Sequence, residues 1–284
     1  MIDKCCVCNC SLIKPLYAGV KKCEECGFAF AGVKLTHEEL INIYKKEYFF
    51  GEEYSNYIAD KTILQKNFDL RLKVLKNYID PSRHKNLIEI GSAYGFFLDV
   101  LRRNFSFINS LGIDVNEEGV RFAQEQLNLS VIHDDFLDHD FGTEKFDVVC
   151  LWDTIEHLRD PHLCLEKISR CTKEGAILAI TTGDIESMNA RTRKEKWRLI
   201  RPPIHLQYFS KKSIERLLNN YDFNIIYNRY CGFYRSLDNT AHNIFVLRKN
   251  QPWMYNLLRK TGLTGIDFYL NLYDIMFVIG RKRS

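Results

Sequence analysis

From residue 86 to its C-terminus, the sequence alternates between short apolar runs and amphipathic stretches. The apolar runs have the length of buried strands, and the amphipathic stretches have the length and period of helices. This alternation is typical of a parallel sheet covered by helices. We therefore predict an α/β fold, with strands over residues 86–91, 110–114, 131–134, 146–152, 175–183, 223–231 and 273–282.

The remaining segments also show helical patterns. Helices are expected between the strands at 96–104, 117–127, 161–171 and 210–221, and ahead of them at about 60–79. Thr36 and Glu39 have the spacing of a capping box, which predicts a helix start. The aromatic-rich segment 36–82 is interpreted as a linker that docks the small N-terminal domain onto the large one, or as a lid over a ligand pocket. A second aromatic-rich stretch, an insertion at about 236–270, is interpreted as a substrate cap or a dimer surface.

The N-terminal 35 residues contain a cysteine cluster. Two pairs with a two-residue gap are separated by 14 residues: Cys5, Cys8, Cys23 and Cys26. This spacing predicts a double-knuckle Zn²⁺ site, and four thiolates leave no open position, so the metal would be structural. Cys6 and Cys10 do not fit the register and are interpreted as bystanders. A redox cluster without metal is the alternative.

A turn of small residues, "EIGSAYG", follows the first strand of the main domain. Such a turn lets a ligand approach the backbone at the strand's carboxyl end. Asp114 closes the next strand, where a carboxylate can bind ribose hydroxyls. The nicotinamide fingerprint is G-x-G-x-x-G, but its third glycine would fall on Phe96, so nicotinamide binding is the poorer interpretation.

Composition limits the location and the partners. The 284 residues include 46% hydrophobic and 27% charged residues, as in soluble globular proteins. No apolar run has the length of a membrane span, and the N-terminus has no apolar signal core, so we expect a cytoplasmic protein without a membrane partner. A net charge of +4 argues only weakly for a nucleic-acid partner.

Five segments in consistent order resemble the class I S-adenosylmethionine-dependent methyltransferases. They are "LIEIGSAYGFFLDVL", "LGIDVNEEGV", "HDDF", "FDVVCLWDTIEHLRDP" and "EGAILAITTGD". The resemblance covers residues 86 to about 232. It implies a Rossmann-like seven-stranded sheet with helices on both faces and a reversed last strand. The double knuckle followed by a tyrosine-rich stretch is similar to a bacterial subgroup that methylates sugars, often as nucleotide conjugates, or other small metabolites.

The resemblance implies roles for residues at the first two strand ends. Gly91, Ala93 and Gly95 would line the methionine and ribose part of S-adenosylmethionine, although the family most often has glycine where Ala93 stands. Glu89 would support the amino group of the cofactor, directly or through water. Asp114 would bind both ribose hydroxyls.

The resemblance also implies an adenine site. Asp135, or Asp134 if the register slips by one, would accept a hydrogen bond from the exocyclic amine. Phe136 would pack beside the ring. Trp152, at the end of the fourth strand, is assigned to the same cofactor site.

A basic run follows the fifth strand. Glu195 is the one acid among six bases: Arg191, Arg193, Lys194, Lys196, Arg198 and Arg201. A run of this kind is usually a solvated helix face. The functional interpretation is an anion clamp in which Arg198 and Arg201 bind a phosphate of the acceptor. Trp197 would then stack on a base or sugar, or else belong to the core.

The stretch "DTIEH" follows the fourth strand directly. On a helix, Asp153, Glu156 and His157 would share one face. With His205 they resemble an acid-x-x-Glu-His plus distal His arrangement that binds a divalent ion in some RNA 3′-end and ubiquinone-pathway O-methyltransferases. Three interpretations stay open: a structural role for Glu156 and His157, a base role for His205 or His157, and a catalytic Mg²⁺ or Mn²⁺ site.

Together these observations predict a methyltransferase that uses S-adenosylmethionine. The expected acceptor is a small anionic molecule, and a phosphate-bearing or nucleotide-linked sugar fits best. An RNA methyltransferase that uses the knuckles to bind substrate is one alternative. A binding protein without catalysis is another, and the pattern of Gly91, Gly95 and Asp114 argues against it.

Overall fold

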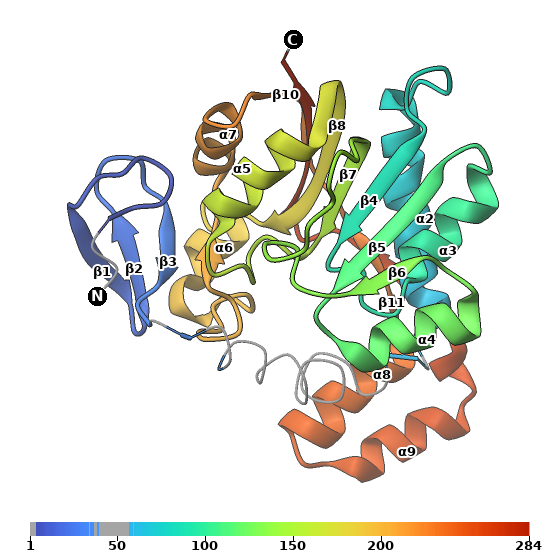
Figure 1. The fold of residues 1–284 in the computed structure, drawn as a ribbon. Coiled ribbons are helices and arrows are strands. Elements are labelled where there is room, and N and C mark those ends of the chain that lie inside the picture. The colour runs from blue at the N-terminus through green and yellow to red at the C-terminus, as the bar shows by residue number, and fades with distance from the viewer. Residues whose placement is uncertain (1–3, 34, 37–38, 40–56, 59, 284) are drawn as a thin grey trace.

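The computed structural model describes residues 4–33, 35–36, 39, 57–58 and 60–283. Its centre is a seven-stranded sheet in the order β10-β13-β8-β7-β4-β5-β6 (Figure 1). β13 runs antiparallel to both of its neighbours, and the pairings from β8 to β6 are parallel. The strands are β4 (Asn86–Ile90), β5 (Asn109–Asp114), β6 (Val131–His133), β7 (Phe146–Trp152), β8 (Thr172–Gly183), β10 (Phe223–Tyr230) and β13 (Ile275–Lys282). The predicted α/β fold with a reversed last strand is confirmed.

Helices cover both faces of this sheet because its central strands are apolar on both sides. Along β7, Val148 and Cys150 join one core, while Val149 and Leu151 join the other. The first core is closed by α2 (Lys61–Leu75), α3 (Phe96–Asn104) and α4 (Glu117–Leu127). The second is closed by α5 (Pro161–Cys171) and α7 (Lys211–Asn219). A 3₁₀ turn at Lys76–Tyr78 extends α2 to nearly the predicted end.

The cysteine-rich N-terminal segment is a small antiparallel sheet. It contains β1 (Ile13–Tyr17), β2 (Val20–Cys23) and β3 (Ala29–Ala31), and its fourth strand is β9 (Gln207–Tyr208) from the main domain. Phe28 packs against Phe209 with ring centroids 5.2 Å apart. The predicted boundary at residue 35 therefore separates strands that are hydrogen bonded in one sheet.

An insertion lies between β10 and β13. It begins with β11 (Phe233–Ser236), continues through α8 (Leu237–Ala241), a π-helical segment (His242–Arg248), α9 (Pro252–Lys260) and a 3₁₀ turn (Leu263–Gly265), and returns in β12 (Asp267–Leu270). β11 and β12 pair with each other. Asn67 of α2 exchanges two hydrogen bonds with the backbone of Tyr234, which fixes the insertion to α2.

Part of the predicted lid lies outside the described residues. The capping box is present, because Glu39 accepts from the Thr36 backbone at 2.7 Å and the Thr36 hydroxyl accepts from the Glu39 backbone at 3.2 Å. Tyr57 stacks on Phe96 with a centroid separation of 5.4 Å. Tyr44, Tyr48, Phe49, Phe50 and Tyr54 are not among the described residues. No helix in the described ranges is long and apolar enough to cross a membrane.

Candidate active site

A cavity of about 590 Å³ lies at the carboxyl ends of β4, β5 and β7. α2 and the insertion supply its other walls through residues such as Asn67, Phe233 and Asn239. The predicted site residues that line it are Gly91, Ala93, Asp114, Asp134, Asp135, Phe136, Trp152, Asp153, His157, Arg198 and His205. Glu89, Gly95, Trp197 and Arg201 are not among its lining residues.

The turn after β4 contains three residues in the left-handed region, and two of them, Gly91 and Ala93, line the cavity. Gly91 has φ +76°, and a Cβ there would lie 2.7 Å from the Thr154 side chain. Ala93 has φ +47°, and its backbone N–H donates to Asp114 Oδ2 at 2.7 Å. Asn116 N donates to Asp114 Oδ1 at 2.8 Å. Burial raises the pKa of the Asp114 carboxyl group. Each oxygen of this carboxyl group keeps lone-pair capacity for a ligand.

Two residues predicted to contact the cofactor lie behind the cavity wall. Glu89 is 2% exposed, and Oε2 has no hydrogen-bond partner within the described part of the chain. Burial first, and then nearby Asp114, raises its pKa well above the ordinary value. Gly95 is required for packing instead: it has φ +72°, and a Cβ would lie 2.8 Å from Leu129 and 3.0 Å from Ala123. Gly95 is not among the lining residues of the cavity, and its contact with the cofactor stays a prediction.

The residues assigned to adenine lie together on one side of the cavity. Asp134 pairs with His139 at 2.9 Å, and Asp135 Oδ1 accepts from Leu137 N at 2.7 Å. Phe136 is buried beside them. Trp152 is also buried, and its indole Nε1 has no hydrogen-bond partner among the residues described.

The segment after β7 is a series of turns, so the predicted helix through "DTIEH" is wrong. Asp153 has φ +51° and is held by Thr181, whose Oγ1 accepts from Asp153 N at 3.0 Å and donates to Asp153 Oδ1 at 2.8 Å. Arg71 Nη2 lies 2.5 Å from the other carboxylate oxygen of Asp153. The helix begins only at Pro161, whose fixed φ suits the first helical position.

These turns nevertheless bring Glu156 and His157 to the cavity, where they meet His205 from the segment before β9. Glu156 is 6% exposed, Oε2 has no partner in the described part of the protein, and burial raises its pKa to about 8. His157 Nδ1 lies 3.0 Å from the Ile204 carbonyl oxygen, and His205 Nδ1 lies 2.8 Å from that of Leu199. Since carbonyl oxygens only accept, we assign the hydrogen to Nδ1 in both rings.

The two imidazole rings are in contact. Their centroids are 4.8 Å apart with a T-shaped geometry. Burial, and then the neighbouring His205, lowers the pKa of His157 to about 3. His157 is therefore neutral at physiological pH, and its Nε2 is a weak base.

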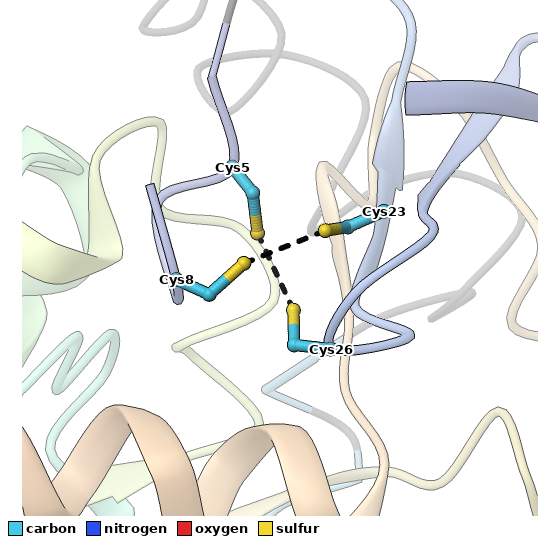
Figure 2. Close-up of side chains that lie close together, drawn as sticks. All are labelled: Cys5, Cys8, Cys23 and Cys26. Carbon is cyan, nitrogen blue, oxygen red and sulfur yellow. Dashed lines mark hydrogen bonds between the residues drawn. The ribbon is translucent and has the colours of Figure 1, made fainter. Parts of the chain in front are cut away.

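Among the described residues, one group has the geometry of a metal site, and it is the four predicted cysteines. Their sulfur atoms all lie within 4.8 Å of one another, and the Cys5–Cys26 and Cys8–Cys23 pairs are each separated by 3.5 Å. Figure 2 shows the four side chains pointing to a common centre. A tetrahedral zinc with Zn–S bonds of about 2.3 Å needs sulfur separations of about 3.8 Å, so the residues fit Zn²⁺.

Other details agree with the knuckle geometry. Asn9 has φ +62° and Gly27 has φ +74°, which are the left-handed turns predicted after each knuckle. Cys6 and Cys10 lie outside the group. The ligand atoms of Asp153, Glu156, His157 and His205 do not converge in this way, so the geometry does not favour a divalent ion there.

The basic run divides into three parts. Residues 191–196 are exposed, as a solvated face would be. Trp197 is 2% exposed and donates to Asp274 Oδ2 at 2.9 Å, so it belongs to the core and does not stack on a ligand. Arg198 lines the cavity, pairs with Asp274 Oδ1 at 3.0 Å, and its buried Nε has no partner among the described residues. Arg201 is not among the lining residues of the cavity, and its part in the clamp stays a prediction.

One cavity residue was not assigned any role from the sequence. Arg71 comes from α2 and reaches the end of β7, a contact that no local pattern indicates. For Glu156 the sequence left a structural role and a metal-ligand role open, and the structure adds an oxygen without a partner among the described residues and a raised pKa. One sequence feature could have indicated a chemical role for Glu156: it lies four residues beyond the end of a fully buried strand.

A methyltransferase domain family matches residues 60–228. The carboxy-S-adenosyl-L-methionine synthase of Nautilia profundicola is 26% identical over 111 residues, which are 36% of this chain and 47% of that protein. The chain thus spans about half the length of this curated relative.

Solved structures share the fold at low identity. A SAM-dependent methyltransferase from Thermotoga maritima superposes with a TM-score of 0.52 at 19% identity, covering 80% of this chain and 95% of that one. The magnesium protoporphyrin IX methyltransferase of Synechocystis, solved with bound SAH, gives 0.53 at 13% identity and covers 83% and 91%.

Proposed function

The chain belongs to the methyltransferase domain family, and from this premise we propose that it methylates a small anionic acceptor, a phosphate-bearing or nucleotide-linked sugar. S-adenosylmethionine supplies an electrophilic methyl group on a cationic sulfur. The protein then has to hold the acceptor in line with that methyl group, which can provide much of the acceleration.

The residues at the carboxyl ends of β4 and β5 fit this cofactor. Gly91 lines the cavity and carries no side chain, so a ligand can approach its backbone there. Asp114 is oriented by two backbone donors and lines the cavity, as a ribose-binding carboxylate must. Glu89 provides a second buried acid near the same turn. Acids suit a ligand that carries a sulfonium and an ammonium group.

The observation that carries the acceptor proposal is the environment of Arg198. Asp274 holds one end of its guanidinium group, and the buried Nε–H has no partner within the described residues. A second cation, Arg235, lies over the same Phe233 ring at 4.6 Å, compared with 5.7 Å for Arg198. Two guanidinium groups beside one cavity wall suit an anionic ligand, because a phosphate accepts from both.

We assign removal of the acceptor's proton to one of two side chains near the turns after β7, Glu156 or His205. Glu156 has a pKa of about 8, which is close to the operating pH of an effective general base. His205 Nε2 is the second candidate, because its Nδ1 is committed to Leu199. Asp153 is held by Arg71 and Thr181, so we assign it an orienting role.

The N-terminal cysteines are assigned a structural role. They are the four ligands of one proposed Zn²⁺, and no position would be open for catalysis. Because β3 pairs with β9, the metal would stabilise the strand that follows His205. We infer that zinc indirectly stabilises the position of His205 on the acceptor side of the cavity.

A panel of nucleotide sugars, sugar phosphates and their unphosphorylated forms, assayed with labelled cofactor, tests the proposal. With a phosphorylated acceptor, Arg198→Ala should raise KM roughly tenfold or more and leave cofactor affinity unchanged. Arg193→Ala is the matched control, since Arg193 is exposed in the same run. Equal KM values with and without phosphate, or methylation of RNA in place of the panel, would contradict the proposal.

A further inference from the structure

The insertion has an outer surface that combines apolar and basic side chains. We define the cap surface as Trp253, Leu257 and Lys260 of α9, with Leu263 and Ile266 in the turn that follows. Trp253 is 64% exposed and Leu257 is 60% exposed. The α9 residues are spaced by four and three, so they share one face of the helix.

The opposite face of α9 is turned toward the rest of the insertion. Met254, Tyr255 and Leu258 are partly buried, and the Tyr255 hydroxyl donates to Asp238 Oδ1 at 3.0 Å. The exposed apolar residues are therefore not needed to hold α9 in place. Figure 1 shows α9 at the outer end of the molecule, beyond α8 and away from the sheet.

The charge of this segment has one sign. Between Asp238 and Asp267 the sequence contains no acid and four bases, the pair Arg248 and Lys249 before α9 and the pair Arg259 and Lys260 in its last turn. Lys249, Arg259 and Lys260 are exposed. Exposed bases thus lie at both ends of α9, with Lys260 on the apolar face itself and Arg259 over the Tyr255 ring at 5.8 Å.

The inner side of the insertion differs from the outer side. Asn239, Thr240 and Asn243 line the cavity, so the inward surface is polar. The same segment therefore closes the active-site cavity with amides and a hydroxyl while it presents apolar and basic groups outward. The outward surface has no role in the cavity that we have described.

We propose that the cap surface docks on the surface of a membrane that contains anionic phospholipids. A helix with aromatic and aliphatic side chains on one face and bases beside them lies in the interface, with its apolar groups among the lipid headgroups. Such a helix does not span the bilayer, so the proposal agrees with the lack of a spanning helix among the described residues. A second copy of the chain fits less well, because two-fold pairing would bring the bases of both copies together.

Tryptophan fluorescence reports directly on this surface. The chain has three tryptophans, and Trp152 and Trp197 are 6% and 2% exposed, so Trp253 is the one that solvent reaches. Vesicles of phosphatidylcholine mixed with phosphatidylglycerol should shift the emission of the full chain to shorter wavelength. Vesicles of phosphatidylcholine alone should shift it less, and added salt should weaken the effect.

Co-sedimentation with the same vesicles compares the wild type with substituted chains. Trp253→Asn with Leu257→Asn should lower partitioning roughly tenfold or more, and Arg259→Glu with Lys260→Glu should do the same. The matched controls are Leu12→Asn with Met188→Asn, which replace exposed apolar residues elsewhere, and Lys194→Glu with Lys196→Glu in the exposed basic run. These controls should keep wild-type partitioning.

Two results would overturn the proposal. One is a chain that does not partition to anionic vesicles. The other is a self-association that Trp253→Asn with Leu257→Asn abolishes while vesicle binding stays unchanged, which would assign the cap surface to a second copy. Neither result bears on the acceptor proposal, which depends on Arg198.

Discussion

Arg71 of α2 and Asp153, directly after β7, form an ion pair between residues 82 positions apart. The Arg71 guanidinium also lies over the Trp152 ring at 5.5 Å and over Phe68 at 5.2 Å. These two aromatic rings limit its access to solvent, and its side chain is 15% exposed. The pair therefore connects the helix that precedes the main domain to the centre of the cavity.

We predict measurable coupling between these two residues. In urea unfolding, a cycle of Arg71→Met, Asp153→Asn and the double variant should give a coupling free energy of about 1 kcal/mol. The value is modest because the Asp153 side chain is 41% exposed. Arg103→Met with Asp153→Asn is the control pair, since Arg103 is exposed on α3. If the effects of the two single substitutions add up to that of the double variant within about 0.3 kcal/mol, the pair does not stabilise the fold.

Cofactor binding should depend on Asp114. Asp114→Ala removes the acceptor of two backbone N–H groups and the proposed ribose ligand. We expect calorimetry to show S-adenosylmethionine binding weakened by about 2 kcal/mol, which is roughly thirtyfold. Glu117→Ala, an exposed change in the first turn of α4, should bind as the wild type does. Unchanged affinity in folded Asp114→Ala would place the ribose elsewhere.

The strands and helices of the main domain could be predicted because their patterns are local. The apolar run 146–152 is a fully buried strand, and the amphipathic run 161–171 is a helix with the predicted bounds. The segment between them could not be predicted, because spacings of three and four also occur in turns. Asp153 is held in a left-handed conformation by Thr181 of the neighbouring strand, and this contact depends on the sheet.

In the candidate site, too, features set by local sequence could be predicted and features set by distant contacts could not. Cys5, Cys8, Cys23 and Cys26 were recognisable because knuckle spacing is local and thiolate chemistry is specific. Arg198 and Arg201 were not distinguishable in the sequence. What distinguishes Arg198 in the structure is its ion pair with Asp274, directly before β13, at the cavity wall. Contacts between distant segments of this kind are set by the fold as a whole.

The zinc proposal predicts about one zinc per chain in protein purified without chelators. Cys23→Ser should lower the zinc content and the free energy of unfolding, because zinc binding to a structural site contributes to folding. Cys10→Ser is the matched control: Cys10 lies in the same segment but outside the four-sulfur group, so its zinc content should stay at the wild-type level. Metal analysis that finds no zinc, or the same zinc content in Cys23→Ser, would contradict the assignment.

Glu156 should make stability depend on pH. Burial raises its pKa from the model-peptide value of 4.5 to about 8, so the folded state binds this proton more tightly than the unfolded state does. Its contribution to the free energy of unfolding is complete below the unfolded pKa, falls as the pH rises through the window between the two values, and is lost above the folded pKa. Glu156→Gln stays neutral throughout.

The measurement compares urea unfolding of the two proteins at several pH values inside that window. The stability of Glu156→Gln relative to the wild type should increase with pH, by at most about 1.4 kcal/mol per pH unit. Glu125→Gln, an exposed change on α4, should show no such trend. A difference between Glu156→Gln and the wild type that is constant with pH would mean that Glu156 ionises in the folded state as it does in the unfolded chain, and it would no longer be a candidate for a base poised near neutral pH.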